Sequence, residues 1–195
     1  GPIDPLPMFE ADSGIFSDYS LRFYDNRAIK GVPVDSSTYG QEITLKKAVS
    51  YMNVNVQKYF YTWFNNMKDN GYDDYKIKIN AVLRPFSRSV ELKEQNPLNA
   101  SPGKSVHNYA AGIDINIVDP TGRVFMKNER DPWIEQGIVA EAEKAGLMWG
   151  GNIPGYRDSV HFYKPFNIIQ AQANAAAANP GKPQKDWDTK DTKIT

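Results

Sequence analysis

The chain has 195 residues, which suits one compact domain with additional terminal segments, whereas two full domains would be cramped. Its 23 basic and 23 acidic side chains cancel, so nucleic acid and membrane surfaces are disfavoured as partners bound mainly by charge. The absence of cysteine excludes disulfide scaffolds, cysteine-ligated zinc and thiol nucleophiles. No apolar run approaches the ~18 residues that a membrane span needs, and no signal peptide is visible at the N-terminus.

The first long periodic segment follows an irregular start. Residues 1–40 are rich in Pro, Gly, Asp and Ser, which predicts an irregular N-terminal arm with room for one short strand. Apolar residues then recur at helical spacing over 45–67, so a helix is expected there, with Thr44 as its cap. The aromatic side chains of this helix are expected to pack into the core.

The middle of the chain alternates between strand and loop patterns. Residues 75–83 alternate apolar and polar side chains, as a half-buried strand does. Residues 84–104 are polar and contain three prolines, which predicts a long loop with one short helix. Residues 113–118 alternate again and end in a turn sequence at 119–122, so residues 123–126 are expected to pair back as a hairpin.

A second helix and a polar tail complete the chain. Residues 132–145 predict a helix with Asp131 as cap and Gly146 at its end. Residues 167–195 predict a flexible C-terminal tail, or a linker to a further segment. Helices and strands do not alternate as parallel units, so residues 41–166 are expected to form one α+β domain, with helices packed against a small, mostly antiparallel sheet.

Both histidines of the chain lie in polar, turn-rich surroundings beside a carboxylate. In the strand 113–118 the isoleucines occupy one face, so Asp114 must point to the other. Small residues separate this strand from His107, which lets a loop imidazole and a strand carboxylate converge on one ion. His161 would complete a set of three nitrogen and oxygen donors, which is typical of a catalytic zinc with one open position. The alternative for each histidine is an ordinary surface or core residue.

The segment around the first histidine resembles the zinc D-Ala-D-Ala carboxypeptidase and L-alanyl-D-glutamate endopeptidase family, whose fold is shared by hedgehog signalling domains. The first motif of this family is Ser-x-His, two residues, then Gly-x-Ala-x-Asp. Ser105, His107 and Asp114 stand at the matching positions. The glycine and alanine of the motif are exchanged, as Ala110 and Gly112, and both remain small.

The second histidine motif of the endolysin-like branch is Trp-Gly-Gly followed by Asp-x-x-His-Phe. Trp149-Gly150-Gly151 and Asp158-Ser-Val-His161-Phe162 match it without a gap. Asn152 and Val160 depart from the pattern, where aspartate and proline are common, but neither is a proposed ligand or base. The resemblance covers residues 45–166, with a weaker match to the arginine that follows the family's upstream strand.

The resemblance implies a peptidoglycan peptidase with one Zn²⁺ held by His107, Asp114 and His161. It implies that Asp158 is the general base toward the water, and then the acid toward the leaving amine. Arg84 is the implied cation for the oxyanion or for a substrate carboxylate. The remaining residues implied to support the substrate or the ligands are Arg88 as a substitute for Arg84, together with Ser105, Tyr109 and Trp149.

The sequence leaves alternatives for the peptide bond that is cut and for the biological setting. The Trp-Gly-Gly motif favours an L-Ala-D-Glu-type endopeptidase, with a D-Ala-D-Ala carboxypeptidase as the enzymatic alternative. A non-catalytic cell-wall binding module with the same fold is the alternative from another class. The expected partner is bacterial peptidoglycan, reached as a periplasmic, secreted or phage-delivered protein, or as part of a larger phage or secretion-system protein.

Overall fold

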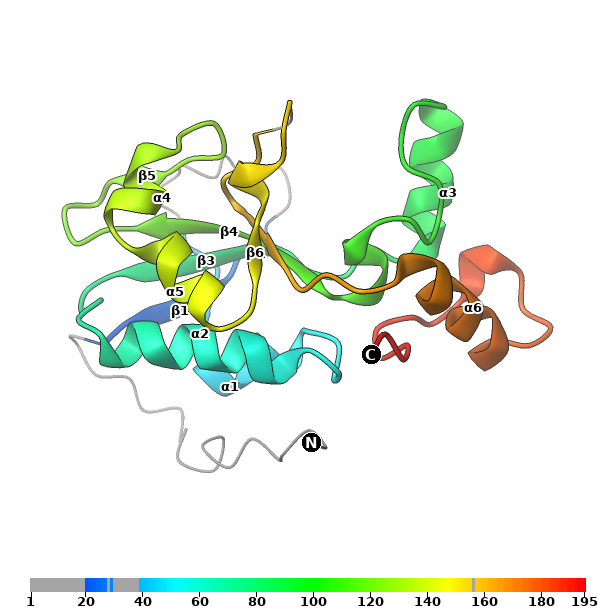
Figure 1. Cartoon of the computed structure of the whole chain (residues 1–195), viewed down its shortest axis with the longest axis horizontal. Coiled ribbons are helices and arrows are strands. Elements are labelled where there is room, and N and C mark those ends of the chain that lie inside the picture. Colours follow the sequence, from blue (N-terminus) through cyan, green and yellow to red (C-terminus); the bar gives the residue numbers. More distant parts are fainter. Residues whose placement is uncertain (1–19, 28, 30–38, 156) are drawn as a thin grey trace.

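The computed structural model describes residues 20–27, 29, 39–155 and 157–195. In this part of the chain one seven-stranded sheet runs in the order β2-β1-β3-β4-β7-β6, with β5 paired to β4 (Figure 1). All pairings are antiparallel except that of β1 with β3, so the expected α+β class with a mostly antiparallel sheet is confirmed. The strands are β1 (Arg22–Asp25), β2 (Gln41–Ile43), β3 (Lys76–Ala81), β4 (Gly112–Val118), β5 (Val124–Phe125), β6 (Met148–Trp149) and β7 (His161–Tyr163).

One face of the sheet packs against the helix α2 (Gln57–Asp69). The ring of Phe64 lies 5.1 Å from that of Phe23 on β1, and the ring of Trp63 lies 4.5 Å from that of Phe162 on β7. The isoleucines of β4 are fully buried, as their alternation predicted. The face with the isoleucines is therefore the apolar one, and the alternate residues of β4 and β7 point to the opposite face.

The helix expected over 45–67 is two helices, α1 (Leu45–Ser50) and α2. Thr44 caps α1 as predicted, because its side chain accepts a hydrogen bond from the backbone N–H of Lys47. The break falls at Asn53, whose backbone N–H bonds to the carbonyl of Ala110 instead of continuing a helix. Apolar spacing continues across the break, since Met52 and Val56 are both buried, and so periodicity alone did not reveal it.

The helix expected over 132–145 is also divided, into α4 (Asp131–Glu135) and α5 (Ile138–Lys144). Gly137 separates them with a φ of 80°, a left-handed conformation that ends one helix before the next begins. Asp131 is not the cap, because α4 begins with it and the flanking cap position belongs to Arg130. The helix in the 84–104 loop is α3 (Phe86–Gln95).

The N-terminal segment contributes a strand to the interior of the sheet. β1 lies between β2 and β3, and its residue Phe23 is buried in the core. Residues 22–25 are thus a short strand of the kind for which the predicted arm had room, and this strand belongs to the sheet. Much of the predicted arm, residues 1–19, 28 and 30–38, lies outside the described residues.

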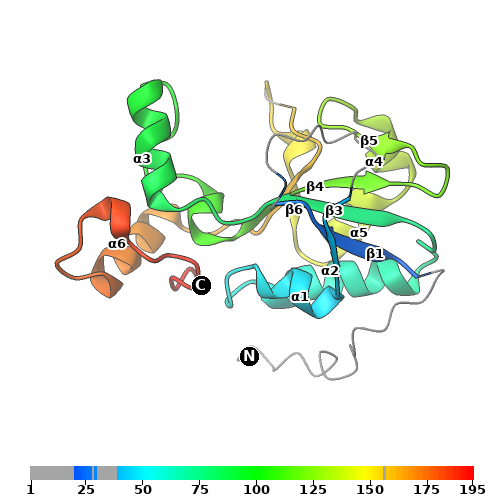
Figure 2. The ribbon, with the colours of Figure 1, turned by 180° about the vertical axis from the view of Figure 1, so that it is seen from behind.

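The C-terminal segment corrects the expectation of a flexible tail. It forms the helix α6 (Ile168–Ala178) and a return segment that lies with α3 at one end of the sheet (Figures 1 and 2). Ala171, Ala175 and Thr189 are buried there, because small side chains let the segment pack closely and its polar groups find partners. Domain boundaries at 40/41 and 166/167 stay a prediction. None of the described helices has the length and apolar character needed to cross a membrane.

Candidate metal centre

The site begins with a cross-strand neighbour relationship between β4 and β7. Ile113 stands opposite Phe162 and Asp114 stands opposite His161. Ile113 and Phe162 are buried in the core, so Asp114 and His161 share the other face of the sheet. The Nδ1 atom of His161 lies 2.8 Å from Oδ1 of Asp114.

His107 reaches the same point from the short 3-10 helix η2 (Val106–Tyr109), just before β4. Ser105 caps η2, and its hydroxyl accepts a hydrogen bond from the backbone N–H of His107 at 3.2 Å. The imidazole donates from Nδ1 to the carbonyl of Val82, 2.7 Å away at the end of β3. The remaining ring nitrogen, Nε2, faces Oδ2 of Asp114 at 3.3 Å. It donates a hydrogen bond to this oxygen when the ring is protonated, and offers a lone pair to an ion when the ring is neutral.

The side chains of His107, Asp114 and His161 bring their ligand atoms within 4.8 Å of one another. Among the described residues, this is the group that could hold a metal ion. Ligands held ~2.1 Å from a tetrahedral zinc lie roughly 3.4 Å apart. The distance from Nε2 of His107 to Oδ2 of Asp114 is close to this at 3.3 Å, and that from Nδ1 of His161 to Oδ1 of Asp114 is shorter at 2.8 Å. Two imidazole nitrogens and one carboxylate form a donor set that zinc accepts. The residues predicted as ligands therefore fit the ion in both chemistry and spacing.

The electrostatics of the cluster tie its members together. Burial opposes the charged form of Asp114, but hydrogen bonds from His107 and His161 and their charges outweigh it and hold its pKa far below the usual range. Burial likewise opposes the charged form of His107, and the hydrogen bond and charge of Asp114 outweigh it and raise its pKa. The surroundings of Asp114 therefore favour its ionised form when a cation, either an imidazolium group or a metal ion, lies beside it.

Asp158 lies in the turn before β7, half-buried beside the cluster. Its backbone carbonyl accepts a hydrogen bond from the N–H of His161 at 3.2 Å, which fixes the turn. Burial, followed by the negative charge of Asp114, raises the pKa of its carboxyl group. Its Oδ1 atom is buried without a hydrogen-bond partner among the described residues, so its capacity to accept a hydrogen bond is unused within this part of the chain.

Two glycines make room for the second histidine. A Cβ atom on Gly112 would lie 2.7 Å from Cγ2 of Val106 and 3.0 Å from Cε1 of His161. A Cβ atom on Gly150 would lie 2.6 Å from the carbonyl oxygen of Asp158 and 2.9 Å from Cβ of His161. Steric fit thus explains why β4 begins with a glycine and why a glycine follows Trp149.

Arg84 and Arg88 line a cleft of about 500 Å³ that has His107 in its wall. The backbone N–H of Arg84 donates to the carbonyl of His107 at 2.8 Å, which joins this residue directly to the loop that carries His107. Arg88 is paired with Glu91 at 3.0 Å on the exposed side of α3. The structure therefore brings both arginines near His107, with Arg88 already engaged by a carboxylate.

Tyr109 and Trp149 are core residues that support the site from behind. The hydroxyl of Tyr109 donates to the carbonyl of Gly103, its ring is fully buried, and burial raises its pKa to about 12. The indole N–H of Trp149 donates to the carbonyl of Ser159 at 2.8 Å, next to Asp158. Neither side chain is exposed to a substrate, so their contribution is to hold the loops that carry the site.

Two contributors were missed by sequence reasoning. The carbonyl of Val82 orients His107, but a backbone acceptor leaves no trace in residue type. Asn108 is fully buried and joins the loop to its surroundings, with its side-chain N–H₂ donating to the carbonyl of Arg84 and the hydroxyl of Ser89. The available signal in the sequence was an asparagine directly after His107, inside the first histidine motif.

The comparison with protein families agrees with these motifs. Residues 99–164 match the family model described as D-alanyl-D-alanine carboxypeptidase, which confirms the suspected resemblance over the segment that holds both histidine motifs. None of the curated proteins compared with the chain matches it. Among solved structures, the L-Ala D-Glu endopeptidase ChiX of Serratia marcescens is similar, at 16% identity and a TM-score of 0.46, over 62% of this chain and 86% of that chain.

Proposed function

We propose that the protein is a zinc-dependent peptidase that hydrolyses amide bonds in the stem peptides of bacterial peptidoglycan. The observation that carries the proposal is the convergence of His107, Asp114 and His161 beside the unpartnered, buried oxygen of Asp158. Metal-assisted amide hydrolysis needs three protein ligands for the metal and a nearby carboxylate that can act as a general base. The family match over residues 99–164 supports the peptidase class.

The ligand set would hold one Zn²⁺, which supplies a Lewis acid that polarises a carbonyl and lowers the pKa of a water molecule. Asp158 takes the proton from the attacking water and then delivers it to the leaving amine. Its raised pKa suits this exchange, because a carboxyl group closer to neutrality can both accept and return a proton. The Val82 carbonyl keeps His107 in the tautomer that presents Nε2.

Arg84 is proposed to neutralise negative charge on the substrate side of the cleft. Its guanidinium can hold a carboxylate of the stem peptide through two hydrogen bonds, or stabilise the oxyanion that forms during attack. The wall peptide carries free carboxylates, so a cleft lined by three arginines (Arg27, Arg84 and Arg88) together with His107 suits such a substrate. The site of action is then the cell wall, outside the cytoplasmic membrane.

The Trp149-Gly150-Gly151 motif favours an L-Ala-D-Glu-type endopeptidase as the specific activity. A D-Ala-D-Ala carboxypeptidase is the second candidate, and the description of the matching family favours it. The two activities differ in the bond cut and not in the zinc chemistry.

The deciding experiment measures bound metal and cleavage products of the same preparation. Defined muropeptides that contain both bonds would be digested with the zinc-loaded protein and with protein stripped by a chelator. One zinc per chain and products cut after L-Ala are expected, with activity lost on stripping and restored by zinc. Release of a terminal D-Ala would select the second candidate. Zinc binding without any cleavage would instead indicate a binding module.

A further inference from the structure

The segment after α6 lies outside the matched region and yet reaches the loop of the first metal ligand. This loop, residues 105–111, is built around the fully buried Asn108. The Oδ1 atom of Asn108 accepts hydrogen bonds from the backbone N–H groups of Gly103 and Ser105, both at 3.1 Å. Its Nδ2 atom donates to the carbonyl of Arg84 at 3.0 Å and to the hydroxyl of Ser89 at 2.9 Å. The side chain of Asn108 is therefore fully engaged.

The backbone carbonyl of Asn108 is engaged by the C-terminal segment. The hydroxyl of Thr189 donates a hydrogen bond to it, and Thr189 is only 2% exposed. Because Asn108 directly follows His107, this contact acts one residue from a proposed metal ligand. A buried carbonyl that loses its donor must move toward another partner or remain unsatisfied.

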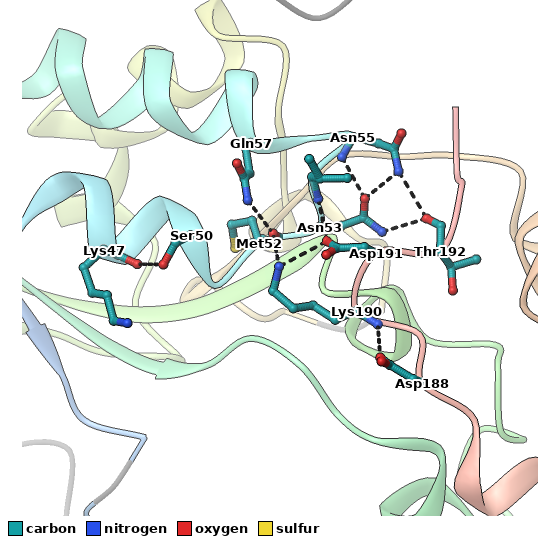
Figure 3. A network of polar contacts seen from close by, with 11 residues as sticks. Lys47, Ser50, Met52, Asn53, Asn55, Gln57, Asp188, Lys190, Asp191 and Thr192 are labelled. Carbon is teal, nitrogen blue, oxygen red and sulfur yellow. Dashed lines mark hydrogen bonds and ion pairs between the residues drawn. The ribbon is translucent and has the colours of Figure 1, made fainter. Parts of the chain in front are cut away.

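The segment that carries Thr189 is itself anchored to the break between α1 and α2 (Figure 3). Asn53 donates from Nδ2 to the carbonyl of Thr192 at 2.8 Å, and Val54 donates its backbone N–H to the carboxylate of Asp191 at 3.0 Å. Lys190 donates from Nζ to the carbonyl of Met52 at 3.0 Å. Three successive residues of the segment, 190–192, are thus hydrogen-bonded to the break at residues 52–54.

The break at residues 52–54 also holds the C-terminal part of the loop 105–111. The backbone N–H of Asn53 donates to the carbonyl of Ala110 at 2.9 Å. Ala110 has a left-handed conformation, with φ of 54°, which a residue with a Cβ atom adopts only when its surroundings hold it there. The loop is therefore clamped at Asn108 by Thr189 and at Ala110 by Asn53.

We propose that Thr189 is a positioning residue of the metal centre, and that through the Asn108 carbonyl it sets the position of His107 for the ion. The proposal rests on the proposed function in taking zinc as the ion. It assigns to the C-terminal segment a part in metal affinity and not only in stability.

The test compares two threonines of one segment. Thr189→Val removes the hydroxyl that bonds to Asn108 and keeps the side-chain shape. Thr192→Val is the matched control, because the Thr192 hydroxyl is also buried and has no hydrogen-bond partner among the described residues. Thr189→Ser retains the hydroxyl and serves as the conservative rescue.

Two readouts separate positioning from stability. The first is the zinc dissociation constant from competition with a chelator. Thr189→Val is expected to raise it about tenfold or more, as loss of a supporting contact around a metal ligand does. Thr192→Val and Thr189→Ser are expected to keep the wild-type value. The second is the imidazole nitrogen NMR spectrum without metal, where the signals of His107 should move in Thr189→Val while those of His161 stay in place.

The proposal is overturned if Thr189→Val binds zinc as the control does and leaves the His107 signals unmoved, however much stability it loses. Absence of zinc from the wild type would refute the proposed function, while the His107 signals of the metal-free protein still decide the role of Thr189. If Thr189→Val does not fold, Asp191→Ala replaces it, since this side chain is half-exposed and its loss frees Val54 without burying a polar group. Weaker zinc binding with shifted His107 signals is expected there too, and wild-type behaviour would overturn the proposal.

Discussion

Asp114 and His161 are direct neighbours across two antiparallel strands, with Oδ1 and Nδ1 2.8 Å apart. The same carboxylate faces Nε2 of His107 through its other oxygen at 3.3 Å. A single aspartate on a rigid strand therefore organises both imidazoles before any ion binds. The predictions below follow from this arrangement and from the groups around it.

The metal-free protein should show a stability maximum in mildly acidic solution. The pKa of Asp114 is lowered by folding, so its contribution is present above its unfolded pKa of about 4 and is lost as pH falls through its folded value. The pKa of His107 is raised, so its contribution is present below about 6.5 and is lost as pH rises through its folded value. Urea unfolding in chelator across this range should give the largest free energy of unfolding between these limits.

Asp114→Asn should flatten that profile, because it removes both the carboxyl group whose pKa is lowered and the charge that raises the pKa of His107. An unchanged profile in this variant would show that other groups dominate the pH dependence. The variant should also bind zinc far more weakly, since a neutral amide replaces the anionic ligand.

Asp158→Asn should keep one zinc per chain and lose about 10²- to 10⁴-fold in kcat, because the proton acceptor is gone while the three ligands remain. In the wild type, kcat/KM should fall as pH drops through a pKa above the ordinary 3.8 of this carboxyl group. Steady-state kinetics over a pH series with metal analysis would measure both. Asp73→Asn, at an exposed position, is the control and should behave as wild type. Activity near wild type in Asp158→Asn would exclude the general-base role.

Arg84→Ala should lower kcat/KM by about 10²- to 10³-fold without changing zinc affinity, because the side chain faces the cleft and only its backbone holds His107. Arg88→Ala is the matched variant and should stay near wild type, since Arg88 is paired with Glu91 on the surface. Cleavage of a defined stem peptide by both variants separates the two. The reverse order of effects would assign the substrate charge to Arg88.

Gly150→Ala should destabilise the fold by about 1–3 kcal/mol, because the added Cβ atom would lie too close to the Asp158 carbonyl and to His161. Urea unfolding gives the free energy, and zinc titration should show weaker binding. Ser87→Ala, at an exposed position of α3, is the control, because it adds no atom and causes no crowding. Equal stability of both variants would contradict the tight packing around His161.

The sequence by itself determined the composition of the site and the face on which it stands. Alternation of isoleucine with polar residues over 113–118 placed Asp114 on the face away from the core, because successive side chains of a strand point in opposite directions. Two histidines, each beside a carboxylate in a recognisable motif, predicted the proposed ligand set, and the structure brings these residues together. These features depend on local spacing, which a sequence displays directly.

Only the tertiary structure decided how the parts meet. The register that sets Asp114 opposite His161, the Val82 carbonyl that orients His107 and the Thr189 hydroxyl on Asn108 all join residues far apart in the chain. The break of the 45–67 helix at Asn53 and the packing of the C-terminal segment also depend on contacts between residues far apart in the chain. Such contacts are chosen by the burial and hydrogen-bond pairing of the whole fold, and local composition does not encode which distant partner satisfies a given backbone group.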